Sequence, residues 1–378
     1  MHDLHAHLTG SITGGSLFDM IYGSRLYLSN KEKINSLTEP FGIRLSDRIS
    51  QIGHSARDEF ARLYACRPNG KKRFGEVMQR FVLISYVLES DPTMRERTGE
   101  MVGKDMKKTG TTYVEWRIDP FSATKNQTAE EGSEKLLEFY DGLKRSSLDF
   151  RFIIGLAKHR YKTGSETDHE RVRFAAEQSR KLLDICDELP IVGLDAVNKE
   201  DVPIRDLKPF FSLSDSYNLG ISPHVGECTS NSLEENLDTV LDALEIGASR
   251  LGHAIVAYMP LETYLGNSDV YGKVYDSRRI EKLNRKQSDV LAAIKETGAV
   301  IEVCPTSNMA AHLGLKDMKK HPIDRLLAEN VPFVVCSDDY GVFGSPLKRE
   351  ISRLARAKNL DAGKLETAAE RYSFKNLG

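Results

Sequence analysis

The chain has 378 residues, of which 40% are hydrophobic and 29% charged, and its mean hydropathy is −0.40. This composition is typical of a globular protein with enough apolar residues for a large core, and it excludes the disordered and collagen-like classes. The formal net charge of −2 gives no overall attraction to a polyanion, so we expect a small-molecule ligand and no polymeric nucleic acid.

The sequence contains neither a run of about 18 apolar residues nor the basic-then-apolar pattern of a signal peptide. We therefore expect a cytoplasmic protein that does not bind membranes. The five cysteines are scattered without a C-x-x-C pair, so we expect free thiols and no structural zinc ribbon. No pattern in the sequence indicates an oligomeric state.

Eight short, apolar, β-branched segments recur along the chain, and each is followed by a stretch with apolar residues three and four apart. Segments that are apolar along their whole length are typical of parallel strands covered on both faces. The predicted strands are residues 2–8, 111–118, 150–157, 191–197, 220–226, 249–255, 299–305 and 331–337. Eight such alternations predict an α/β fold, a closed (β/α)8 TIM barrel.

Two stretches between predicted strands are longer than an ordinary connection. Residues 12–110, after the first strand, predict extra helices inserted over the barrel mouth, and residues 257–290 form a shorter insertion after the sixth strand. The length alone would also allow two or three domains. Because no Pro/Gly/Ser-rich linker or short-period repeat occurs, we interpret residues 1–378 as a single barrel domain.

Polar residues suited to catalysis fall at the carboxyl ends of the predicted strands, which form the active-site face of such a barrel. His5 and His7 are two positions apart on a strand, so both imidazoles project to the same side. Together with His224 and Asp338, from the ends of the fifth and eighth strands, they offer three nitrogens and one oxygen. This donor set suits one Zn2+ ion per chain, with a position left for water.

Five fragments carry a family resemblance: DLHAHLTGS, HVGE, RLGHA, IEVCPTSN and CSDD, in this order across the chain. The set resembles the adenosine deaminase family of metal-dependent hydrolases, and is most similar to its adenosine deaminase-like branch, whose first motif has a neutral residue before G-S. The resemblance implies that the zinc ligands are His5, His7, His224 and Asp338. It further implies that Glu227 carries a proton to N1 of a purine, that His253 holds the attacking hydroxide and that Asp339 binds N7.

The chemistry of purine deamination supports these roles. Loss of a 6-amino group needs hydroxide at C6, and bound zinc lowers the pKa of water to about 7. The ring must also be protonated at N1, which an acid such as Glu227 beside the metal would do. Asp338 and Asp339 are adjacent carboxyls, so one could stay ionised on the metal while the other is protonated and donates to the base. We expect hydrolytic deamination of a 6-aminopurine nucleoside or nucleoside 5′-monophosphate.

Two positions depart from the familiar family pattern, and both lie where the sugar and its 5′ end are expected. Asn198 stands in place of a glycine whose backbone N–H reaches N3 of the purine. Thr9 stands in place of an aspartate that would repel a phosphate, so we expect a monophosphate such as AMP or dAMP to be preferred. Lys158, Arg160 or Lys199 could supply positive charge there. Release of an alkylamine from an N6-alkyl AMP is the alternative.

Three other classes were weighed. A binuclear amidohydrolase needs a lysine at the end of the fourth strand, but the sequence there reads VGLDAVN and Lys199 lies beyond it. The cytidine deaminase class needs H-x-E with P-C-x-x-C, which is absent from the sequence. A catalytically silent nucleotide-binding subunit is disfavoured because every metal-binding and proton-handling residue is present. The PTSN segment (305–308) is expected to be a structural turn, and no role is assigned to His312.

Overall fold

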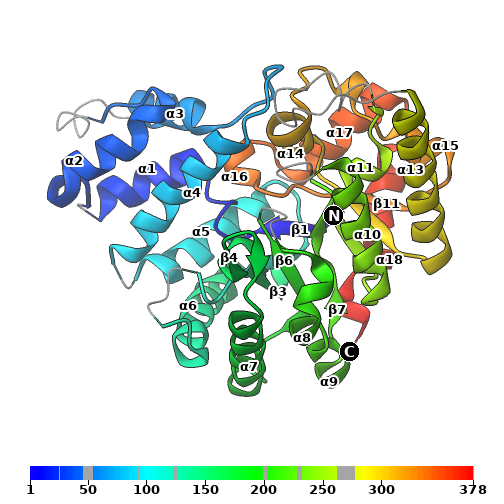
Figure 1. The fold of residues 1–378 in the computed structure, drawn as a ribbon. Helices are drawn as coiled ribbons and strands as arrows, with labels where there is room; N and C mark the ends of the chain where they lie inside the picture. Colours follow the sequence, from blue (N-terminus) through cyan, green and yellow to red (C-terminus); the bar gives the residue numbers. More distant parts are fainter. Residues whose placement is uncertain are drawn as a thin grey trace.

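The computed structural model describes residues 1–24, 26–45, 54–91, 93–122, 126–198, 202–227, 232–261 and 277–377. Within these ranges, parallel strands form a barrel that is surrounded by helices (Figure 1). The barrel strands are β1 (His2–His7), β2 (Tyr113–Ile118), β3 (Asp149–Ala157), β6 (Ile191–Val197), β7 (Gly220–Ile221), β8 (His224–Val225), β9 (Arg250–His253), β10 (Val300–Val303) and β11 (Phe333–Val335). All of them fall at the predicted strands, and the predicted (β/α)8 fold is confirmed.

The strands pair in the order of the chain, as a TIM barrel requires. One sheet has the order β1-β2-β3-β6-β7 and the other β11-β10-β9-β8, and all of their pairings are parallel. β7 and β8 are two halves of one barrel strand, interrupted at Ser222 and Pro223. A separate antiparallel pair, β4 (Lys162–Thr163) with β5 (Glu166–Thr167), was not predicted.

Backbone hydrogen bonds between the first and last strand segments close the barrel. The N–H of His7 donates to the carbonyl oxygen of Asp338 at 3.0 Å, and the N–H of Asp338 donates to the carbonyl oxygen of His5 at 2.8 Å. Three of the predicted metal ligands are therefore held together by the backbone of the closing seam.

The helices that follow the strands form the outer layer (Figure 1). They include α6 (Ala129–Ser146), α7 (His169–Ile185), α10 (Leu233–Glu245), α13 (Ser277–Thr297), α15 (Asp324–Ala328), α17 (Leu347–Lys358) and α18 (Ala362–Tyr372), with the short helices α8 (Lys208–Phe211) and α9 (Leu213–Tyr217). Three other short helices are largely buried: α11 (Ile255–Tyr258), α14 (Pro305–Ser307) and α16 (Tyr340–Phe343). Polar side chains cap the N-termini of several of these helices: Thr128 caps α6, and Ser232 with Glu235 forms a capping box on α10.

The long segment after β1 contains five helices in its described residues: α1 (Gly14–Gly23), α2 (Leu26–Thr38), α3 (His54–Tyr64), α4 (Phe74–Glu89) and α5 (Met94–Lys108). α5 packs tightly on α6, since a Cβ added at Gly142 would lie 1.9 Å from the carbonyl oxygen of Glu96. α5 therefore belongs to the outer layer, and the extra helices are α1–α4. Residues 262–276 of the second predicted insertion lie outside the described residues. Among the helices described, none combines the length and apolarity needed to cross a bilayer.

Candidate active site

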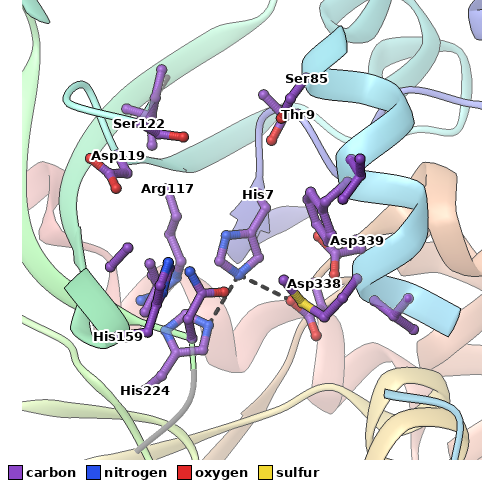
Figure 2. A pocket seen from close by; sticks show the side chains of 18 of the residues that line it. His7, Thr9, Ser85, Arg117, Asp119, Ser122, His159, His224, Asp338 and Asp339 are labelled. Carbon is purple, nitrogen blue, oxygen red and sulfur yellow. Dashed lines mark hydrogen bonds and ion pairs between the residues drawn. The ribbon is translucent and has the colours of Figure 1, made fainter. Parts of the chain in front are cut away.

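Four side chains from the carboxyl ends of three barrel strands meet in one cluster. Nε2 of His224 lies 3.1 Å from Nε2 of His5 and 3.0 Å from Nε2 of His7, and Oδ1 of Asp338 lies 3.2 Å from Nε2 of His7 (Figure 2). Ligands about 2.0–2.1 Å from a tetrahedral zinc ion are about 3.3 Å from one another. The four donor atoms are therefore spaced as the ligands of a single metal ion.

Buried carboxylates fix the tautomers of two of these histidines. Nδ1 of His5 donates to Oε2 of Glu302 at 2.8 Å, and Nδ1 of His224 donates to Oδ1 of Asp195 at 3.0 Å. With the protons on Nδ1, both Nε2 atoms carry lone pairs, which face each other without a proton between them. A cation at their centre would stabilise this arrangement, and a carboxylate behind each imidazole is the usual support of metal-binding histidines.

Two buried arginines neutralise these carboxylates inside the barrel. Arg117 donates to Oδ2 of Asp195 at 2.6 Å and to Oε2 of Glu302. Nε of Arg250 lies 2.9 Å from Oε1 of Glu302, and its Nη2 lies 2.5 Å from Oε2 of Glu115. Since all five side chains are buried, this network stays rigid only if its charges remain paired.

Two further buried carboxyls, Glu227 and Asp339, lie beside the cluster. Oε1 of Glu227 and Oδ1 of Asp339 are buried and make no hydrogen bond within the described part of the chain. Burial raises the pKa of Glu227, and burial together with the Asp338 carboxylate raises the pKa of Asp339 well above its usual range. Both groups are therefore suited to donate a proton to a ligand. Asp339 packs directly on Gly10, where an added Cβ would lie 1.8 Å from its Oδ1.

His253 is oriented by the segment that follows β10. Its Nδ1 lies 2.9 Å from Oδ1 of Asn308, so its Nε2 faces the cluster, 3.8 Å from Oδ2 of Asp338 and 3.9 Å from Oε1 of Glu227. Asn198, His253 and Asp338 all have positive φ angles, of 69°, 61° and 60°. Such backbone strain is characteristic of functional sites, where the surrounding structure holds it.

The cluster forms the floor of a cavity of about 580 Å3. Glu227, His253 and Asn198 line it. Thr9 and Asp339 line it as well (Figure 2). α4 supplies an apolar wall that includes Phe74 and Phe81. Four further basic side chains line it: Lys33, Arg95, Lys135 and Arg160. Two further acidic side chains, Glu89 and Asp119, line it as well. The cavity thus combines the histidine and aspartate cluster and two buried carboxyls with further side chains of both charges.

The structure brings all the predicted site residues to this cavity or, for His5, directly beneath it. Of the two proposed sources of positive charge that the structure describes, Lys158 and Arg160, Arg160 lines the cavity. The prediction for Lys158 is wrong, because this lysine is buried and its Nζ donates to the carbonyl oxygen of His224 at 2.8 Å. Lys199 lies outside the described residues.

The PTSN segment is not the simple turn that was predicted. It forms α14 and the start of the π-helix η6 (Asn308–Leu313), and Asn308 bonds His253 instead of local backbone. Asp195 and Glu302 were not predicted as site residues, although a charged residue within the apolar strands VGLDAV and VIEV is itself a signal. His312, which was given no role, lines the cavity.

A closed barrel with a histidine and aspartate cluster at its strand ends is the architecture of a barrel hydrolase. The family model described as "Adenosine deaminase" matches residues 64–374, which is more than half of the chain. The chain therefore belongs to the adenosine deaminase family of hydrolytic deaminases. His5 and His7 precede the matched region.

Individual relatives are distant. The chain is 25% identical to aminodeoxyfutalosine deaminase of Streptomyces avermitilis over 76% of this chain and 69% of the relative. It is 24% identical to the adenosine deaminase-like protein of Drosophila melanogaster over 92% of this chain and 82% of the relative. Among solved structures, Arabidopsis ADAL complexed with IMP superposes with a TM-score of 0.65 at 19% identity. The match covers 98% of this chain and 91% of the Arabidopsis chain. Other relatives are named adenosine deaminase or adenine deaminase.

Proposed function

We propose that this protein is a zinc-dependent aminohydrolase that removes the 6-amino group of a purine nucleoside 5′-monophosphate and releases ammonia. The observation that carries this proposal is that three histidines and one aspartate converge beside two buried carboxyls, each with one oxygen that makes no hydrogen bond within the described residues. Each group has a counterpart in the chemistry of deamination: a metal site, two proton donors and a base.

His5, His7, His224 and Asp338 would hold the ion, since their donor atoms lie at ligand spacing and the tautomers of His5 and His224 are fixed for it. When bound, zinc lowers the pKa of water to about 7 and so makes a nucleophile available at neutral pH. Nε2 of His253 faces this cluster, 3.8 Å from Oδ2 of Asp338, and is placed to accept a proton of the attacking water.

Glu227 and Asp339 would recognise the purine ring. Burial raises the pKa of both carboxyls and so favours the protonated forms, which can donate to N1 and N7 of the base. During attack the water oxygen bonds to C6, His253 takes one water proton and Glu227 gives its proton to N1. When the C6–N bond breaks, the amine takes the proton held by His253 and the new hydroxyl returns a proton to Glu227. The balance is one water consumed and one ammonia released.

The preference for a monophosphate is supported by side chains that line the cavity. Thr9 brings a neutral hydroxyl to the cavity wall, where an aspartate would carry a negative charge. Two basic residues line the same cavity: Lys135, whose Nζ donates to the carbonyl oxygens of Asp119 and Ser122, and Arg160, which donates to that of Phe121. Similarity to Arabidopsis ADAL, crystallised with IMP, is in line with a nucleotide ligand.

The test is a comparison of kcat/KM for AMP, dAMP, N6-methyl-AMP, adenosine, deoxyadenosine, adenine and aminodeoxyfutalosine with zinc-loaded protein at fixed salt. We expect AMP or dAMP to be preferred, and Thr9→Asp to shift the preference toward the nucleoside. At about 4 Å and an effective dielectric constant of about 20, one pair of unit charges costs about 4 kcal/mol. Preference for a nucleoside, or an unchanged ratio in the variant, would show that Thr9 is not the selector. Turnover of none of these compounds would favour a silent binding subunit.

A further inference from the structure

His312 lies at the active site without an assigned task. It belongs to the π-helix η6, is only 5% exposed and lines the cavity. Its Nε2 lies 3.7 Å from Oε2 of Glu227, and its ring centroid is 5.7 Å from that of Phe74 on α4. The first residue of the same π-helix, Asn308, orients His253. The same short π-helix therefore carries His312, which faces Glu227, and Asn308, which orients the other imidazole beside Glu227. π-Helical segments are frequent at functional sites.

The two oxygens of Glu227 face different imidazoles. Oε1 lies 3.9 Å from Nε2 of His253 and has no hydrogen-bond partner among the described residues, whereas Oε2 faces Nε2 of His312. The Lys158 ammonium and the Asp338 carboxylate also act on Glu227. A carboxyl that must deliver a proton to one ring nitrogen has to present one particular oxygen, so a group that holds the other oxygen would decide its orientation.

His312 is suited to act as a neutral donor. Burial lowers its pKa to about 3, with the nearby His253 and Lys72 acting in the same direction and Asp338 opposing them. A neutral imidazole carries one N–H, and placing it on Nε2 directs it at Glu227. The present separation exceeds a hydrogen bond, but catalytic hydrogen bonds are often long without ligand and tighten when the substrate binds.

We propose that His312 is a positioning residue for Glu227, whose Oε2 it holds through Nε2–H so that Oε1 presents its proton to the ring nitrogen of the substrate. This inference rests on the proposed function, since it requires Glu227 to be the acid. It adds a residue that was not assigned a role from the sequence.

The test compares His312→Leu with His312→Gln, which retains an N–H donor. Glu227 becomes ionised as it gives its proton to the substrate, so loss of one hydrogen bond to the developing carboxylate predicts a fall in kcat of about 10- to 100-fold for His312→Leu with little change in KM. Most of that loss should be recovered in His312→Gln. A donated hydrogen bond favours the ionised carboxylate, so its loss raises the pKa of Glu227. Because catalysis needs protonated Glu227, the high-pH decline of kcat should move to higher pH in His312→Leu only.

Leu313→Ala is the matched structural control, because it loosens the same π-helix one residue further along the chain. It should lower the melting temperature without moving the high-pH decline, and zinc content should stay at wild-type level in all three variants. Wild-type kinetics in His312→Leu, or a pH profile that is unmoved as in Leu313→Ala, would overturn the inference. An active Glu227→Gln variant would instead refute the proposed function itself, so the two failures are distinguishable.

Discussion

The carboxylate behind His224 provides a sharp test of how the barrel interior supports the metal site. Oδ1 of Asp195 accepts hydrogen bonds from Nδ1 and the backbone N–H of His224 at 3.0 and 3.1 Å, and Oδ2 accepts one from Arg117 at 2.6 Å. Asp195→Asn removes the charge and replaces one accepting oxygen by an NH2 group, which must face a donor of either Arg117 or His224. In both orientations His224 loses the buried carboxylate that supports its imidazole as a metal ligand.

Loss of such a supporting carboxylate typically weakens metal binding by 10- to 100-fold, or about 1.4–2.7 kcal/mol. The variant should also lose about 3 kcal/mol of unfolding free energy, at the low end for breaking a buried pair, because Arg117 keeps Glu302. Competition for zinc with a chromophoric chelator measures the first effect, and denaturant titration of the metal-free protein measures the second.

Glu115→Gln is the matched control for this prediction. Glu115 belongs to the same buried network through Arg250, but its other partners are Tyr113, Ser373 and the N–H of Phe374, and no histidine is among these partners. This variant should lose stability while its zinc affinity remains that of the wild type. Equal zinc affinities in Asp195→Asn and wild type, or an equal loss in Glu115→Gln, would refute the reasoning.

Three further outcomes are expected. Replacing His224 by Ala removes a ligand, so zinc content by elemental analysis and deaminase activity should fall together; two metals per active chain would contradict the single site. Glu227→Gln cannot donate a proton and should lose about 10^2- to 10^4-fold in kcat, measured by absorbance, while retaining zinc. Burial lowers the pKa of His321 to about 3. Below about pH 6.5 the unfolded chain therefore binds a proton that the folded chain does not, so stability decreases as the pH is lowered. Relative to His321→Leu, the wild type should lose about 2 kcal/mol between pH 7 and pH 5 in denaturant titrations, and equal losses would contradict this.

The barrel and the cluster were predictable because both depend on simple periodicities. Strands that are apolar along their length indicate a sheet covered on both faces, and eight of them indicate closure. On a strand, His5 and His7 must project to the same side. Since the carboxyl ends of all barrel strands lie on one face, His224 and Asp338 were expected near them despite their distance in sequence.

The features that were missed depend on packing across the barrel. A single strand does not reveal that Glu302 bonds His5, because their contact joins residues 297 positions apart. The π-helix turns His312 toward the cavity, and a one-residue change of helical period cannot be read from the short segment NMAAHL. Lys158 was placed wrongly because it follows β3 in the short 3-10 helix η3 (Lys158–Tyr161), where its Nζ turns inward to the carbonyl oxygen of His224.

The closing seam explains how the site tolerates its strain. Asp338 is a non-glycine residue at a φ of 60°, a conformation that costs on the order of 1–3 kcal/mol. Its backbone N–H and carbonyl are the same groups that bond His5 and His7 and so close the barrel. Opening the strained residue would therefore break the seam between β1 and the segment after β11. The barrel closure thus holds Asp338 in the orientation that brings its carboxylate to the two histidines.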